Sequence, residues 1–159
     1  MTSRIVLIVS VCLLSVLAVW QQWRLAPAYF TKHCFSDLHY TDESSDHYFS
    51  FTGGVVFDFY SNRTGVLTVT GKLMKGDMTY GLSRFTRFNY RKSIGNNYMM
   101  TFTSENPTPH DDIPDEMAGA VLKMLGLTGE HSMYLQAHSD NFITIGNSSS
   151  PFLTCVIKP

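Results

Sequence analysis

The feature that most constrains this chain is an uncharged apolar stretch of sixteen residues, 5–20, which follows Arg4. A membrane-spanning helix needs about 20 mostly apolar residues, with about 17 as the short limit. Trp20, Trp23 and Arg24 extend the stretch, because tryptophan rings settle at the lipid headgroups and an arginine side chain can reach outward from the bilayer. The sequence therefore predicts a transmembrane anchor over residues 5–24, preceded by a cytoplasmic head of residues 1–4.

Two other interpretations of the stretch stay open: a cleavable signal peptide cut after Ala28, and a buried helix of a soluble protein. The flanking charges do not fix the orientation, since Arg4 and the terminal amine are balanced by Arg24, Lys32 and His33 on the other side. The short head and the polar remainder favour an N-terminus inside the cell. An anchor and a signal peptide would both carry residues 29–159 across the membrane as one exported domain.

The exported part, about 130 residues, has the length of one ordinary domain and can bury a core unaided. The whole chain has 12 Lys+Arg against 13 Asp+Glu, and its longest basic run is the pair Arg91–Lys92. A nucleic-acid-binding surface needs a basic face to neutralise phosphates. We therefore expect no direct binding of nucleic acid by this chain.

The three cysteines differ in their places along the chain. Cys12 lies within the apolar stretch, where it is expected to act as a small packing residue. Cys34 and Cys155 lie at the two ends of the exported part, so an oxidising compartment would let them form a disulfide that closes nearly the whole domain. The alternative is two unrelated thiols.

Apolar and polar residues alternate with period two over most of the exported part, which predicts antiparallel strands. The alternation is imperfect at residues 83–86, which predicts a β-bulge or a bend there. The acidic segment 111–116 contains a proline and precedes apolar residues at helical spacing, which predicts one short helix. Seven or eight strands and one helix predict a mainly β fold, either an antiparallel curved sheet or a small calycin-like barrel. The expected strands include residues 48–60, 66–75, 78–92, 98–104, 133–136, 141–145 and 152–157.

The chain contains no GxSxG, HExxH, P-loop or GxGxxG motif, so we expect no enzymatic activity, no catalytic residues and no cofactor. Small barrels can enclose an apolar molecule, and apolar residues on the predicted strands are candidates to line such a ligand cavity. The alternative is that the same residues form a plain core. The candidates are Phe57, Phe59, Leu67, Val69, Tyr98, Met100 and Phe102.

Four of the six histidines lie near carboxylates in the sequence: His33, His39, His47 and His110. They are candidates for pH sensing, because an imidazole titrates at about pH 6.5. The alternative is that they are solvated surface histidines. They lack the compact spacing of metal ligands, so no metal site is expected.

The order of these features resembles the FidL-like family of inner-membrane proteins of enteric bacteria. The resemblance rests on the N-terminal membrane segment, on Cys34, and on further segments spread over most of the chain. These segments are FTGGVVFDF at 51–59, NRTGVLTVTG at 62–71, RFTRFNY at 84–90, DDIPD at 111–115 and IGNSSSPFLTC at 145–155.

Family members are similar to ToxS and PsaF, accessory partners of membrane-bound activators that carry a cytoplasmic winged-helix DNA-binding domain, such as ToxR. The resemblance implies a single-pass inner-membrane protein whose periplasmic domain, residues 29–159, binds a ToxR-like transcriptional activator and conveys signals such as acid or bile. It also implies a bile salt or another apolar small molecule as ligand, beside membrane lipid, and it supports the pairing of Cys34 with Cys155. The alternative function is a membrane-tethered, lipocalin-like carrier of a small apolar ligand in the periplasm.

Overall fold

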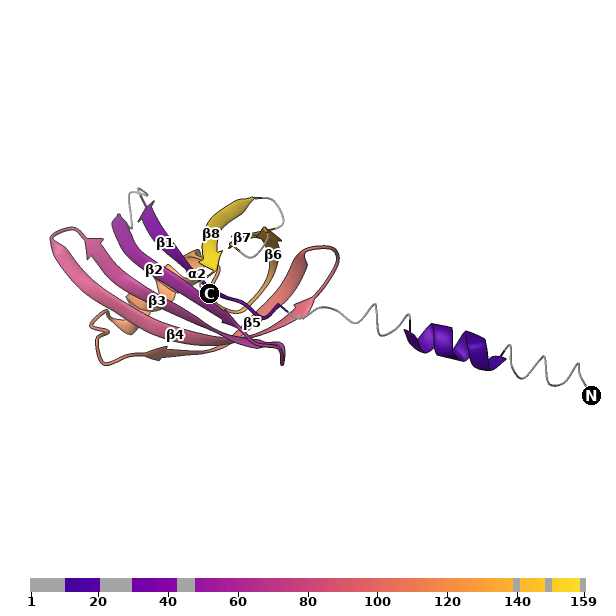
Figure 1. The fold of residues 1–159 in the computed structure, drawn as a ribbon. Coiled ribbons are helices and arrows are strands. Elements are labelled where there is room, and N and C mark those ends of the chain that lie inside the picture. Colours follow the sequence, from indigo (N-terminus) through magenta and orange to yellow (C-terminus); the bar gives the residue numbers. More distant parts are fainter. Residues whose placement is uncertain (1–10, 21–29, 43–47, 139–140, 148–149, 158–159) are drawn as a thin grey trace, which may run out of the picture.

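The computed structural model describes residues 11–20, 30–42, 48–138, 141–147 and 150–157. Eight antiparallel strands form a closed barrel in sequence order, and a helix, α2, lies between the fifth and sixth strands (Figure 1). The mainly β fold and the small antiparallel barrel are thus confirmed. The elements are β1 His33–Asp42, β2 Phe49–Phe59, β3 Thr64–Lys75, β4 Met78–Lys92, β5 Asn97–Pro107, α2 Asp115–Met124, β6 Glu130–His138, β7 Phe142–Gly146 and β8 Pro151–Ile157.

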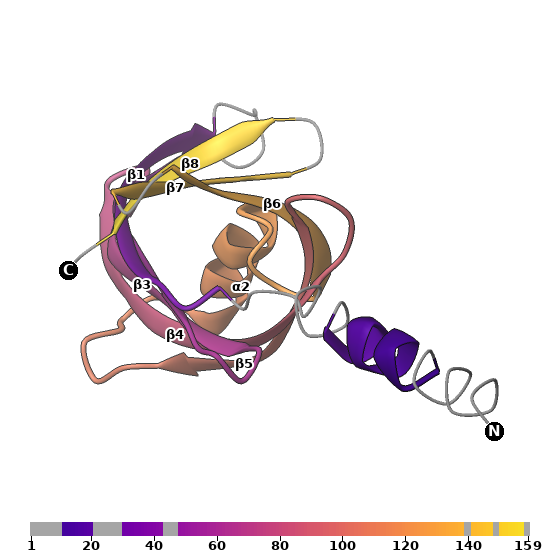
Figure 2. The ribbon, with the colours of Figure 1, turned by 45° about the vertical axis from the view of Figure 1, so that its right-hand side comes forward.

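The barrel has two ends that the chain connects differently. We call one end the entry end: the chain enters β1 there, and it contains the β2–β3 turn and the β4–β5 turn. We call the other end the α2 end: it contains the β3–β4 turn and the segment that leads from β5 into α2. Figure 2 shows α2 within the ring of strands. The helix buries Ala118, Val121 and Leu122, so it contributes to the core of the barrel.

Strand β4 corrects one sequence prediction. Its burial alternates without interruption from Leu82 to Tyr90, so of the two irregularities predicted at residues 83–86, a bulge or a bend, the bulge is wrong. The apparent break arises because two polar residues, Arg84 and Thr86, occupy inward positions and are 4% and 5% exposed. The irregularity in register lies further along the strand, between Arg87 and Phe88 opposite β5.

The pairing of β8 with β1 closes the barrel. Within the described residues this register covers two pairs, Cys34 with Ile157 and Phe35 with Val156. The neighbouring β1–β2 register extends over the whole of β1. The predicted disulfide between Cys34 and Cys155 is present, with a Cα–Cα distance of 5.3 Å, and both cysteines are fully buried. The disulfide therefore joins the two strands at the shortest junction of the barrel.

The predicted membrane anchor falls only partly within the described residues. Residues 11–20 form a helix with exposed apolar side chains, and Cys12 on it is a free cysteine. Residues 5–10 and 21–24 lie outside the described part of the chain. Of the helices within the described ranges, none has the length and apolar character that crossing a membrane requires.

Candidate functional site

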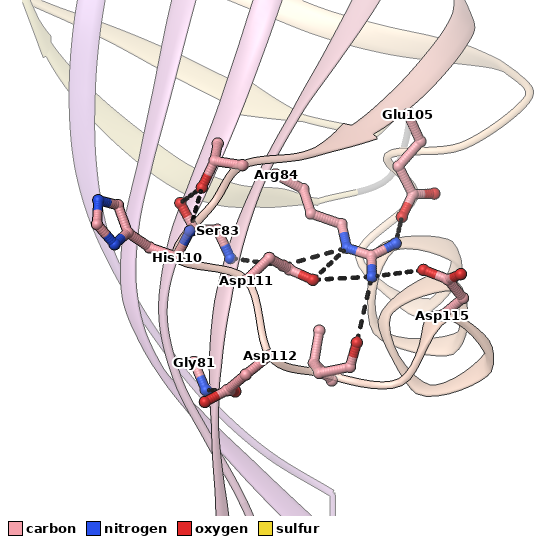
Figure 3. Close-up of polar contacts among 10 residues, drawn as sticks. Gly81, Ser83, Arg84, Glu105, His110, Asp111, Asp112 and Asp115 are labelled. Carbon is pink, nitrogen blue, oxygen red and sulfur yellow. Dashed lines mark hydrogen bonds and ion pairs between the residues drawn. The ribbon is translucent and has the colours of Figure 1, made fainter.

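The α2 end of the barrel contains a buried arginine surrounded by acidic groups (Figure 3). Arg84 points inward from β4, and its Nη1 lies 2.7 Å from Oε1 of Glu105. Its Nη2 lies 2.9 Å from Oδ1 of Asp111 and 2.8 Å from Oδ1 of Asp115, and it also donates to the carbonyl oxygen of Ile113 at 3.3 Å. One guanidinium group therefore connects strand β5, the segment after it and the first turn of α2.

The segment after β5 is held along β4 by the backbone as well as by Arg84. The β4–β5 register ends where Arg84 pairs with Pro107, and carboxylates then take over as acceptors for the backbone of β4. Asp111 accepts from the N–H of Ser83 at 2.8 Å, and Asp112 accepts from the N–H of Gly81 at 2.5 Å. The DDIPD segment thus satisfies backbone donors that a further strand would otherwise satisfy.

Burial opposes the positive charge of Arg84, but its hydrogen bonds with Asp111, Glu105 and Asp115 outweigh that effect. The pKa of Arg84 is consequently raised above its ordinary value, and the side chain stays charged at any physiological pH. The side chain of Asp111 is 3% exposed and that of Asp115 is 90% exposed, so Asp111 is the buried partner of the pair. The arrangement joins the first turn of α2 to β4 and β5.

A groove of about 490 Å³ lies between α2 and the rim of the barrel. The rim contributes the last residues of β1 and β3 and the first residue of β2, and α2 contributes side chains between Glu116 and Val121. This volume falls within the range of small-molecule sites, which is about 300–1,000 Å³. The lining is apolar at Phe49, Pro114, Met117, Ala120 and Val121, and charged at Asp42, Lys75 and Glu116.

The structure brings the predicted ligand-lining residues together inside the barrel. All seven side chains are buried, with exposures from 0% for Leu67 and Met100 to 9% for Phe102. They pack closely among themselves and with their neighbours: the rings of Phe57 and Phe59 stack at 5.8 Å, and Phe59 meets Phe88 edge-on at 5.4 Å. Phe102 also borders a smaller hollow of about 170 Å³. These contacts are those of a packed core. That these seven residues line a ligand cavity stays a prediction.

Of the predicted pH-sensing histidines, the three that the structure describes lie apart from one another. His33 at the entry end is paired with Asp58, and Nδ1 of His39 lies 2.8 Å from the hydroxyl of Thr52. His110 is exposed on the segment after β5, and His47 lies outside the described residues. Within the described ranges, no group of three or more His, Cys, Asp or Glu side chains is arranged to hold a metal ion. A role of single histidines in pH sensing stays a prediction.

The Arg84 cluster and the groove were not predicted from the sequence. Two signals pointed to the cluster: a charged residue at an inward position of β4, and the DDIPD segment 27 residues later. The groove has no comparable signal, because its lining comes from four separate elements.

The comparison with family models gives one match. Residues 71–155, more than half of the chain, match the family described as FidL-like putative membrane protein. The match runs from the end of β3 into β8, so it includes Arg84, the DDIPD segment, α2 and Cys155. No curated protein matches the chain.

Proposed function

Because this chain belongs to the FidL-like family of membrane proteins, we propose that it is a single-pass inner-membrane protein whose periplasmic barrel binds and modulates a ToxR-like activator. The activator would be membrane-bound, with a winged-helix DNA-binding domain on the cytoplasmic side. In this role the barrel is a binding module rather than an enzyme. Signals such as acid or bile would change how strongly the two periplasmic domains bind each other.

The disulfide supports a periplasmic location for the barrel. Disulfides persist in oxidising compartments such as the bacterial periplasm and are rare in the cytosol. Cys34 and Cys155 are fully buried and join strands 121 residues apart in sequence. The apolar stretch of residues 5–20 would then anchor the domain to the membrane.

The observation that carries the proposed pairing is the short junction between β1 and β8. Along β1, after the two residues that pair with β8, the part from Asp37 to Asp42 pairs with β2 on one side. On its other side, the register with β8 does not continue among the described residues. A strand edge of this kind offers backbone N–H and C=O groups to an added strand. We infer that the activator adds a strand along this part of β1.

Ligand or proton binding would act through this pairing. A ligand changes an equilibrium only by the difference in its affinity for the two states. The groove lies against the last residue of β1, Asp42, so a molecule bound there would contact the same rim of the barrel that the activator is proposed to use. Binding in the groove and pairing along β1 would thereby be coupled.

Site-specific photo-cross-linking tests the pairing. Thr41 on β1 and Lys72 on β3 are both exposed, and each is replaced by benzoylphenylalanine in the full-length protein. We expect illumination of membranes that contain both proteins to cross-link the activator at position 41 and not at position 72. Equal yields at the two positions, or no product at position 41, would contradict strand addition along β1.

The groove favours a second candidate function, a membrane-tethered, lipocalin-like carrier of a small apolar ligand. Its apolar lining and its volume of about 490 Å³ suit such a ligand. Extraction and mass spectrometry of the protein purified from membranes discriminate between the two candidates. A co-purifying lipid or other apolar molecule, with no activator in the same preparation, would favour the carrier.

A further inference from the structure

The two ends of the barrel carry opposite charge. At the entry end, Lys32, Arg63, Arg91 and Lys92 are close to the start of β1 and to the two turns. The acidic residues near them in the described part of the chain are Asp58 and Glu130, and Oε1 of Glu130 lies 3.8 Å from Nη2 of Arg91. At the α2 end the acidic residues dominate. They are Asp42, Asp77, Glu105, Asp111, Asp112, Asp115 and Glu116, against Lys75, Arg84 and Lys123.

Exposed apolar side chains lie in the turns at the entry end. Ile94, in the β4–β5 turn, is 83% exposed, and Tyr60, at the start of the β2–β3 turn, is 45% exposed. Both flank exposed cations, Lys92 in the first case and Arg63 in the second. Apolar tips between cations are the composition of surfaces that insert shallowly among lipid headgroups.

The conformation of Arg63 adds to this argument. Its φ is 67°, in the left-handed region that favours glycine or asparagine. An arginine at such a position costs backbone strain, which in proteins tends to accompany function. The β2–β3 turn therefore carries a cation at a position where the backbone would accommodate glycine more easily.

The chain reaches the barrel at this same end. The hydroxyl of Tyr90 donates to the carbonyl oxygens of Phe30 and Tyr60, at 2.5 Å and 2.6 Å, so the incoming chain is fixed beside the β2–β3 turn. Ten peptide units separate Trp20 from Phe30. At about 3.3–3.6 Å per residue they span at most about 35 Å. If residues 5–24 cross the membrane, the entry end cannot lie far from the bilayer surface.

We propose that the entry end of the barrel docks on anionic lipid headgroups, with Ile94 and Tyr60 among the headgroups and with Arg63 and Lys92 facing the phosphates. This inference rests on the membrane anchoring in the proposed function and not on the pairing with an activator. Docking fixes the barrel with its acidic α2 end, and the groove, pointing away from the membrane.

The experiment measures how close each end comes to the lipid. The full-length protein with Cys12 replaced by serine is labelled with a fluorophore at Asn96→Cys, in the β4–β5 turn, or at Asp77→Cys, in the β3–β4 turn. It is inserted into nanodiscs of phosphatidylcholine, with or without phosphatidylglycerol, that contain a headgroup-attached nitroxide quencher. We expect strong quenching at position 96 and little at position 77, and a stronger effect with the anionic lipid.

Three variants test the chemistry of docking. Arg63→Asn and Lys92→Ser are separate variants that each remove one cation, and each should lower the docked population about fivefold. Asparagine is chosen at position 63 because it tolerates the positive φ there. Ile94→Ser should also reduce quenching at position 96. Lys72→Ser, an exposed cation on the barrel wall, is the matched control and should have no effect.

The outcomes separate this inference from the proposed function, because no activator is present in the nanodiscs. Docking would be overturned by equal quenching at positions 96 and 77, or by quenching that changes neither with lipid charge nor on removal of Arg63 or Lys92. The proposed pairing with an activator would not be affected by either result. A chain that does not enter nanodiscs would overturn the anchor and the docking together.

Discussion

Removal of Arg84 tests how the α2 end is held together. Arg84→Met keeps an unbranched side chain of similar length but removes the guanidinium group that binds Glu105, Asp111 and Asp115. Asp111, whose side chain is 3% exposed, would keep the N–H of Ser83 as its donor but lose its counter-ion. Breaking a buried ion pair by removing one partner costs about 3–5 kcal/mol in free energy of unfolding. For a domain of this size we expect Tm to fall by roughly 10–20 °C.

Thermal unfolding followed by far-ultraviolet circular dichroism suits this measurement, because both tryptophans, Trp20 and Trp23, lie before the barrel and their fluorescence would not report on it. Asp115→Asn is the matched control: its side chain is 90% exposed, so its ion pair contributes about 0–1 kcal/mol. The double variant Arg84→Met with Asp111→Asn should recover part of the loss, since it removes the uncompensated charge. A loss for Arg84→Met no larger than that for Asp115→Asn would refute the reasoning.

Three further predictions concern the disulfide, the core and the groove. Replacing Cys34 and Cys155 by alanine should lower the free energy of unfolding by about 4–5 kcal/mol in the chain-entropy model, measured by denaturant titration, and an unchanged midpoint would contradict it. Burial raises the pKa of Tyr98, so above pH 10 the unfolded chain releases this proton more readily than the folded one and stability falls as pH rises. Tyr98→Phe should make that alkaline decline shallower in a pH series of unfolding curves, and an equally steep decline would count against it. Ala120→Trp should fill the groove and weaken binding of the apolar dye anilinonaphthalene sulfonate by about tenfold. Lys123 is an exposed residue of α2 outside the groove lining, so Lys123→Trp should leave dye binding unchanged. Similar affinities of the two variants for the dye would exclude the groove as the dye site.

The strands could be predicted from the sequence because their inward residues are mostly apolar. Phe57 and Phe59 on β2, and Leu67 and Val69 on β3, alternate with exposed or half-buried residues as the period-two pattern predicts. Arg84 was misinterpreted for the same reason. The pattern measures polarity rather than burial, so an inward arginine looks like a fault in the strand when its carboxylate partners lie more than 20 residues away.

Other features depend on contacts that a local pattern does not contain. Closure of the barrel requires β1 to meet β8 across nearly the whole domain, and only the positions of Cys34 and Cys155 hinted at it. Alternation along a strand cannot separate a packed interior from a hollow one, because both have apolar inward residues. It also could not show that α2 would lie against the rim and leave a groove there.

The most direct test of the proposed function is the identity of what the protein binds in its own membrane. The tagged full-length protein is recovered from mildly solubilised membranes at neutral and mildly acid pH, with and without bile salt, and the bound proteins are identified by mass spectrometry. The proposed function predicts recovery of a membrane-bound winged-helix activator, in an amount that changes with pH or bile. Absence of such an activator under every one of these conditions would contradict it.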